Sequence, residues 1–155
     1  MSLPVIRGEG DWLMTVTHHH SGMLVLCWAI AGWVAIIPFA IANGALRQAV
    51  LAPRLGMRTA QPLSGILLML AIAGVAWLLV GRLGPQRPHV WAAVGAGWLA
   101  ATLVFEFGLG LGAGRTWDEM LAPYRFVDNN VWPIVLAWVS CAPAVLARVR
   151  GSFAG

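Results

Sequence analysis

Four apolar runs, each about as long as a bilayer is thick, constrain the fold of this chain more than any other feature. They occupy residues 23–42, 63–81, 89–113 and 131–149. A helix needs roughly 20 apolar residues to cross the hydrocarbon core. Composition agrees, because 59% of the residues are hydrophobic and only 10% are charged, whereas soluble domains average about 25% charged residues. We therefore predict an all-α, multi-pass membrane protein, a four-transmembrane-helix bundle that forms one domain over residues 1–155.

Two of the connections between these runs are long and polar. They cover residues 43–61 and 115–130, and four spans place both of them on one side of the membrane, opposite the termini. We expect a short amphipathic segment in each connection. In the second it is formed by Trp117–Leu121, with Thr116 as the N-cap and acidic residues in the first turn.

The basic residues suit a membrane surface better than a nucleic acid. All ten are arginine, and the formal net charge is +4. They lie singly or in pairs between the apolar runs and form no basic helix or basic–aromatic patch, so we predict no nucleic-acid partner. They are placed to contact lipid headgroups and to direct topology. If Arg47 is engaged inside the protein, the remaining arginines favour cytoplasmic termini.

Glu106 lies inside the third apolar run, within Leu-Val-Phe-Glu-Phe-Gly. A carboxylate there is costly unless it is paired, protonated or turned inward, so it is a candidate functional residue. Arg47, just beyond the first run, lies at the same membrane side and is the predicted ion-pair partner. Asn43 shares a helical face with Arg47, and with Gln48 it would shape a polar pocket. Thr102 shares the helical face of Glu106.

Three interpretations of Glu106 stay open at this point. The pair with Arg47 serves helix packing alone, or Glu106 is a proton or cation site within the polar pocket. In the third interpretation the carboxylate reaches the membrane interface without a partner.

Further features concern helix packing. The third run carries small residues on two faces, which predicts that its helix is central in the bundle. Pro53 is expected to end any continuation of the first helix, and Pro143 to kink the fourth. Of the nine tryptophans, five lie deep within the runs and are expected to fill the core: Trp28, Trp33, Trp77, Trp98 and Trp138.

The connection at residues 115–130 is the most polar part of the chain. Its candidate ligand-binding residues are Asp118, Glu119, Tyr124 and Arg125. Carboxylate and amide oxygens in this segment suit a divalent cation. The spacing matches no EF-hand or other defined cation motif, and helix capping and solvation explain these residues adequately.

Four histidines gather on the predicted side of the termini. His18, His19 and His20 precede the first run, and His89 opens the third. Imidazoles in such a group can bind a transition metal or contact a haem. None lies clearly within an opposing pair of helices, where a b-type haem is usually held, so solvated interfacial histidines are the preferred interpretation. We predict no cofactor.

Three stretches resemble a group of small four-helix bacterial inner-membrane proteins. They are residues 43–48 (Asn-Gly-Ala-Leu-Arg-Gln) with the following Leu-Ala-Pro, residues 105–107 (Phe-Glu-Phe), and residues 117–124 with Trp132. In that group a glutamate often follows the arginine, where this chain has Gln48, so position 48 does not ionise here. The resemblance implies a multi-pass protein of the bacterial inner membrane and implies no activity.

The sequence favours a non-enzymatic function, because no nucleophile–base arrangement or phosphate-binding loop is legible. The preferred hypothesis is a membrane-embedded binding or accessory protein organised around Arg47 and Glu106. One alternative is a small proton-coupled transporter that uses Glu106. The second alternative is a membrane enzyme that acts on lipid, with residues 115–130 at the headgroup level. The expected partners are the lipid bilayer and either a second copy of the chain or another membrane protein.

Overall fold

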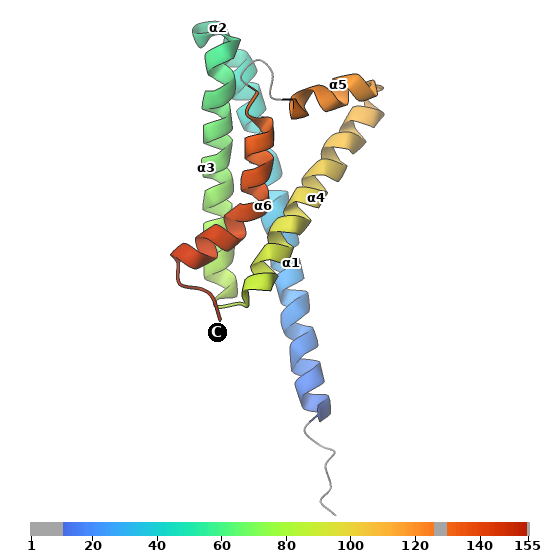
Figure 1. The fold of residues 1–155 in the computed structure, drawn as a ribbon, viewed down its shortest axis with the longest axis vertical. Coiled ribbons are helices and arrows are strands. Elements are labelled where there is room, and N and C mark those ends of the chain that lie inside the picture. Colours follow the sequence, from blue (N-terminus) through green and yellow to red (C-terminus); the bar gives the residue numbers. More distant parts are fainter. Residues whose placement is uncertain (1–10, 126–129, 155) are drawn as a thin grey trace, which may run out of the picture.

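Four long apolar helices make up most of the chain (Figure 1). The computed structural model describes residues 11–125 and 130–154, with side chains from Gly22 onward. Within these ranges there are no β-strands. Each long helix has the length and apolarity to cross a membrane, which confirms the predicted all-α, four-helix integral membrane protein. The four are α1 (Asp11–Leu46), α3 (Met57–Leu83), α4 (Pro88–Gly112) and α6 (Trp132–Val149).

The first helix does not stop at Pro53, contrary to the prediction. A π-helical turn, η1 (Arg47–Leu51), follows α1 directly, and α2 (Ala52–Leu55) continues it with Pro53 in its first turn. Proline is tolerated in a first turn, where its missing N–H has no required partner, and the wider π turn precedes it. The helix ends at Gly56 instead, where φ is +76°, a backbone conformation that favours glycine.

A close crossing joins α4 to α6. A Cβ atom added to Gly95 of α4 would lie only 1.8 Å from the carbonyl oxygen of Ser140 in α6. Beyond this crossing α4 leans away from α3 and α6 toward its C-terminal end (Figure 1). The prediction that the third span is central is therefore wrong: α3 contributes more buried residues than α4. The small residues of α4 allow one close crossing and do not keep the whole helix inside the bundle.

Pro143 coincides with a change of direction in α6. Figure 1 shows α6 running beside α3 over its first half and then bending across it. Proline removes a helical hydrogen bond and crowds the preceding turn. The kink expected from the sequence is thus present.

Indole groups link the helices through their N–H donors. Trp98 of α4 donates to the carbonyl of Ala29 in α1 at 2.8 Å, and Trp138 of α6 donates to the carbonyl of Met69 in α3 at 2.9 Å. Tryptophan suits these positions because the ring fills space while the N–H finds an acceptor. Trp98 is buried, as predicted for the deep tryptophans.

Trp28 and Trp77 do not fill the core, which corrects the prediction for these two residues. They are 37% and 41% exposed. Arg82 lies over the Trp28 ring at 5.5 Å, and Arg150 lies over the Trp77 ring at 4.7 Å. An arginine face on an indole is a favourable cation–π contact. These two rings therefore pack against arginine side chains at the end of the bundle where α3 meets α4.

The two ends of the bundle differ in construction. At one end the C-terminal residues return to the α3–α4 connection, where Gln86 and Ser152 share a backbone hydrogen bond of 3.1 Å. At the other end lie α2 and α5 (Trp117–Leu121), which are the short segments of the two longer connections (Figure 1). The 3₁₀ turn η2 (Ala122–Tyr124) follows α5. Most of the candidate residues from the sequence lie at this second end.

Candidate functional site

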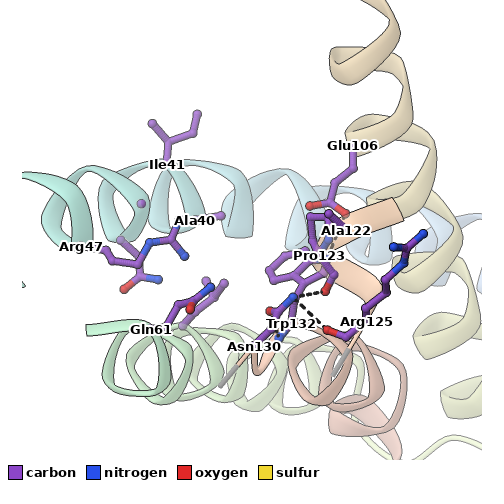
Figure 2. A pocket seen from close by; sticks show the side chains of 13 residues that line it. Ala40, Ile41, Arg47, Gln61, Glu106, Ala122, Pro123, Arg125, Asn130 and Trp132 are labelled. Carbon is purple, nitrogen blue, oxygen red and sulfur yellow. Dashed lines mark hydrogen bonds between the residues drawn. The ribbon is translucent and has the colours of Figure 1, made fainter. Parts of the chain in front are cut away.

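A cavity of about 750 Å³ opens at the α2–α5 end of the bundle. Its walls come from the end of α1, η1, the start of α3, the last turns of α4, η2 and the start of α6 (Figure 2). The lining residues are Ala40, Ile41, Asn43, Gly44, Arg47, Gln61, Leu68, Glu106, Ala122, Pro123, Arg125, Asn130 and Trp132. Both signs of charge and several amides face this one space, next to apolar groups from α1 and α3.

Glu106 is half-buried in the wall formed by α4. Its Oε2 atom accepts a hydrogen bond from the Tyr124 hydroxyl at 2.7 Å and another from Trp132 Nε1 at 3.1 Å. Both bonds go to the same oxygen, so Oε1 stays available within the described part of the chain. Hydrogen bonds to an ionised carboxylate are stronger than those between neutral groups. They tie η2 and the start of α6 to α4.

The predicted ion pair between Arg47 and Glu106 is not formed. Among the described residues the ion pair that does form joins Arg125 and Asp118. Figure 2 shows Arg47 and Glu106 on different sides of the cavity. The physical reason is that α4 leans away from the end of α1, so Tyr124 and Trp132 reach the carboxylate first. The pairing prediction was wrong, but both charges line the same space.

Arg47 and Asn43 share one face of the helical continuation of α1, and both line the cavity. Asn43 Nδ2 donates to the Ser64 carbonyl at 2.9 Å, which fixes the orientation of the amide. Its Oδ1 atom is buried and has no hydrogen-bond partner among the described residues. A buried acceptor without a donor is costly.

Two of the predicted pocket residues lie elsewhere. Gln48 is exposed and does not line the cavity. The Thr102 hydroxyl donates to the Trp98 carbonyl at 2.8 Å and accepts from Trp33 Nε1 at 3.1 Å. Thr102 therefore connects α4 to α1, outside the cavity. Helical periodicity placed Thr102 on the face of Glu106, but it could not show that α1 packs against α4 at Thr102 and not at Glu106.

Asn130 organises the mouth of the cavity on the α6 side. Its Nδ2 donates to the carbonyls of Pro123 and Arg125, as Figure 2 shows, and its Oδ1 accepts from the Trp132 backbone N–H at 3.1 Å. Arg125 is exposed at this mouth and approaches Asp118 at 3.7 Å. An exposed ion pair of this kind contributes little to stability, so Arg125 remains able to engage a ligand.

The short helix α5 is fixed by a capping box. Glu119 N–H donates to Thr116 Oγ1 at 3.4 Å, and Thr116 N–H donates to the Glu119 carboxylate at 2.8 Å. The backbone N–H of Thr116 holds the pKa of the Glu119 carboxyl below its ordinary value. Met120 packs against Gly110 of α4, where an added Cβ would lie 2.6 Å from its sulfur. The N-cap predicted at Thr116 is confirmed, and the reciprocal bond from Glu119 adds a capping box.

A second cavity of about 360 Å³ lies beneath α5, and Glu106 and Pro123 belong to the walls of both cavities. Tyr124, Arg115 and Glu119 complete the polar part of the second lining. Burial raises the pKa of the Tyr124 phenol well above its usual range, and the neighbouring Glu106 carboxylate raises it further. Glu106 and Pro123 therefore belong to the wall that the two cavities share.

The histidines lie away from this site. His18, His19 and His20 belong to the first turns of α1, and their side chains lie outside the described residues. His89 lies at the opposite end of α4, beside an apolar cavity of about 410 Å³ between α1 and α4. Among the described residues, no group of three or more His, Cys, Asp or Glu side chains is placed to hold a metal ion.

Sequence reasoning missed the role of Trp132 and the link from Tyr124 to Glu106. Trp132 lies at the start of the fourth apolar run, and Tyr124 was predicted only as a candidate of the polar connection at residues 115–130. The available signal was that each residue joins an aromatic body to a hydrogen-bond donor, next to a span that contains an unpaired carboxylate.

Comparisons with protein-family models, with curated proteins and with solved structures find no match for this chain.

Proposed function

We propose that this integral membrane protein binds a charged amphipathic ligand, a membrane lipid, in the cavity between Arg47 and Glu106, and that it does so without chemical turnover. The cavity volume, about 750 Å³, falls within the range of small-molecule sites, roughly 300–1,000 Å³. The site lies where the spans end, at the level where lipid headgroups meet the hydrocarbon core.

The observation that carries the proposal is the separation of two opposite charges across one cavity. Arg47 is half-buried and forms no ion pair among the described residues, and Glu106 is bound on one oxygen alone. Partly buried charges without a partner are costly near a bilayer. A ligand that bridges the two walls would compensate both charges at once.

The apolar part of the lining supports a lipid rather than a fully polar ligand. Ile41 of α1 lines the cavity and is 65% exposed. In a membrane-spanning helix, such an exposed apolar side chain faces acyl chains. Leu68 adds a second apolar contact from α3. A headgroup held between the charges can therefore keep its chains in the bilayer.

Native mass spectrometry of the protein purified in a mild detergent tests this proposal. We expect the wild-type chain to retain lipid, and Arg47→Gln and Glu106→Gln each to retain much less. Arg54→Gln is the matched control, because Arg54 is exposed on α2 and does not line the cavity. Equal lipid retention by all four proteins, with helicity unchanged by circular dichroism, would refute the proposal.

A second candidate function, proton-coupled transport, is favoured by the position of Glu106 between two cavities. A carboxylate accessible from both spaces can exchange a proton with each in turn. Proton uptake into liposomes that contain the protein should then depend on Glu106. Uptake that is unchanged in Glu106→Gln would remove this candidate.

A further inference from the structure

We infer that the cavity selects a lipid headgroup that carries both a phosphodiester and a primary ammonium group, as in phosphatidylethanolamine. Arg47 would bind the phosphate, while the Oε1 atom of Glu106 would bind the ammonium. This inference rests on the proposed lipid-binding function and specifies the chemical class of its ligand.

The phosphate side of the site is formed by arginine. Arg47 is half-buried in η1 and lines the cavity, and Arg125 lies at the mouth. The planar guanidinium group presents paired N–H donors that match two phosphate oxygens. No acidic side chain among the described residues neutralises Arg47, so its charge is directed to a ligand.

The ammonium side offers a carboxylate oxygen that lacks a donor. Glu106 Oε1 receives no hydrogen bond within the described part of the chain, because both recorded donors bind Oε2. A primary ammonium group carries three N–H donors, so it can donate to this oxygen while its charge compensates the carboxylate.

The same lining disfavours the other common headgroups. Choline carries a full positive charge but no N–H donor, and it is recognised chiefly by cages of aromatic rings. Trp132 is the single aromatic residue among the cavity-lining side chains of the described chain, and its N–H is already used. A glycerol headgroup brings a net negative charge and would leave Glu106 uncompensated.

A headgroup series on the wild-type protein tests the inference without any substitution. The series is phosphatidylethanolamine, its N-methyl and N,N-dimethyl derivatives, phosphatidylcholine and phosphatidylglycerol, all with identical acyl chains, titrated by native mass spectrometry. Affinity should fall at each methylation, because each methyl group removes one N–H donor. We expect about a tenfold total loss from ethanolamine to choline, which equals about 1.4 kcal/mol. Equal affinity across the methylation series would overturn the inference.

Variants and a soluble analogue locate the selectivity and separate the two proposals. Glu106→Gln should remove the preference for ethanolamine over choline while some binding remains, and Arg47→Gln should weaken binding of every phospholipid. Glycerophosphoethanolamine has the same headgroup but no acyl chains. It should bind weakly if the natural ligand is a lipid, and as tightly as the lipid if the natural ligand is a soluble metabolite. Failure of every lipid to bind would refute the proposed function itself, whereas tight but unselective binding would refute the headgroup assignment alone.

Discussion

At the scale of single residues, the main feature of the site is that the two carboxylate oxygens of Glu106 differ in their hydrogen bonds. Oε2 receives the Tyr124 hydroxyl and the Trp132 indole, and Oε1 is left toward the cavities. One half of the carboxylate therefore stabilises the protein while the other half can meet a ligand or a proton.

The Tyr124 phenol should ionise only at strongly alkaline pH. Burial and the Glu106 carboxylate both raise its pKa, and the chain contains one tyrosine, so phenolate absorbance reports this residue alone. The folded pKa is higher than the unfolded value of about 10. The stability contributed by neutral Tyr124 is thus fully present below pH 10 and is lost as pH rises through the folded pKa.

Glu106→Gln provides the comparison for this titration. It removes the carboxylate charge but leaves the phenol buried, so the pKa of Tyr124 should fall yet stay above its ordinary value. Tyr124→Phe should abolish the signal and confirm its assignment. An ordinary phenol titration in the wild-type protein would contradict the hydrogen bond to Glu106.

Residue identities at the site were partly predictable from the sequence, whereas contacts were not. Glu106 and Arg47 stand out because a charge at the end of an apolar run is rare and costly, and Asn43 stands out because it shares a helical face with Arg47. The partners of Glu106 depend on how the connection after α4 folds back, which helical periodicity does not encode. Trp132 and Tyr124 were therefore assigned to other roles.

At the scale of helices, the crossing of α4 and α6 determines where the cavity opens. Gly95 lies 11 residues before Glu106, which is about 16 Å along a helix at 1.5 Å per residue. Because α4 contacts α6 closely at Gly95 and leans away beyond it (Figure 1), the Glu106 turn stands apart from the end of α1. The capped helix α5 covers the second cavity, with Met120 packed on Gly110.

Gly95→Ala should destabilise the protein by about 1–3 kcal/mol, the usual cost of overpacking. The new methyl group would meet the Ser140 backbone oxygen, which cannot move without displacing α6. Gly97→Ala is the matched control on the same helix, because nothing lies within 4 Å of its added Cβ. Unfolding in mixed micelles followed by circular dichroism measures both variants. Equal stability of the two would show that the helices do not cross at Gly95.

The spans themselves could be predicted closely, and their irregularities less well. Apolar length alone located all four long helices, and Pro143 located the bend in α6. Pro53 misled the prediction because a π turn lets the helix continue into a proline-containing turn. The more buried helix is α3 and not α4. Small residues permit close packing, but they do not specify how much of a helix is packed.

At the scale of the whole molecule, the two ends of the bundle differ in how their polar groups are packed. At one end the C-terminal residues bond to the α3–α4 connection, and arginines stack on Trp28 and Trp77. At the other end the charged cavity lies between the ends of α1 and α4, the turns η1 and η2, and the starts of α3 and α6. The first end is packed against itself, while the second keeps its polar groups available.

Cysteine labelling should place the two short helices on one side of the membrane. In a chain whose two natural cysteines are replaced by serine, Arg54→Cys and Asp118→Cys should react from the same side. Arg87→Cys and Arg148→Cys, near the other end of the bundle, should react from the opposite side. With cytoplasmic termini, a membrane-impermeant maleimide should label the first pair in intact cells. Labelling of Arg54→Cys and Asp118→Cys from different sides would exclude four crossings.

The exposed position of Ile41 on the edge of the cavity determines how the site would be supplied. A ligand that enters past Ile41 arrives from a two-dimensional reservoir, the leaflet itself, and never dissolves in buffer. Occupancy would then follow the mole fraction of that lipid in one leaflet and would not change on dilution of the membranes. Headgroup remodelling by the cell would alter occupancy directly, so the fraction of protein bound would track the composition of the surrounding leaflet.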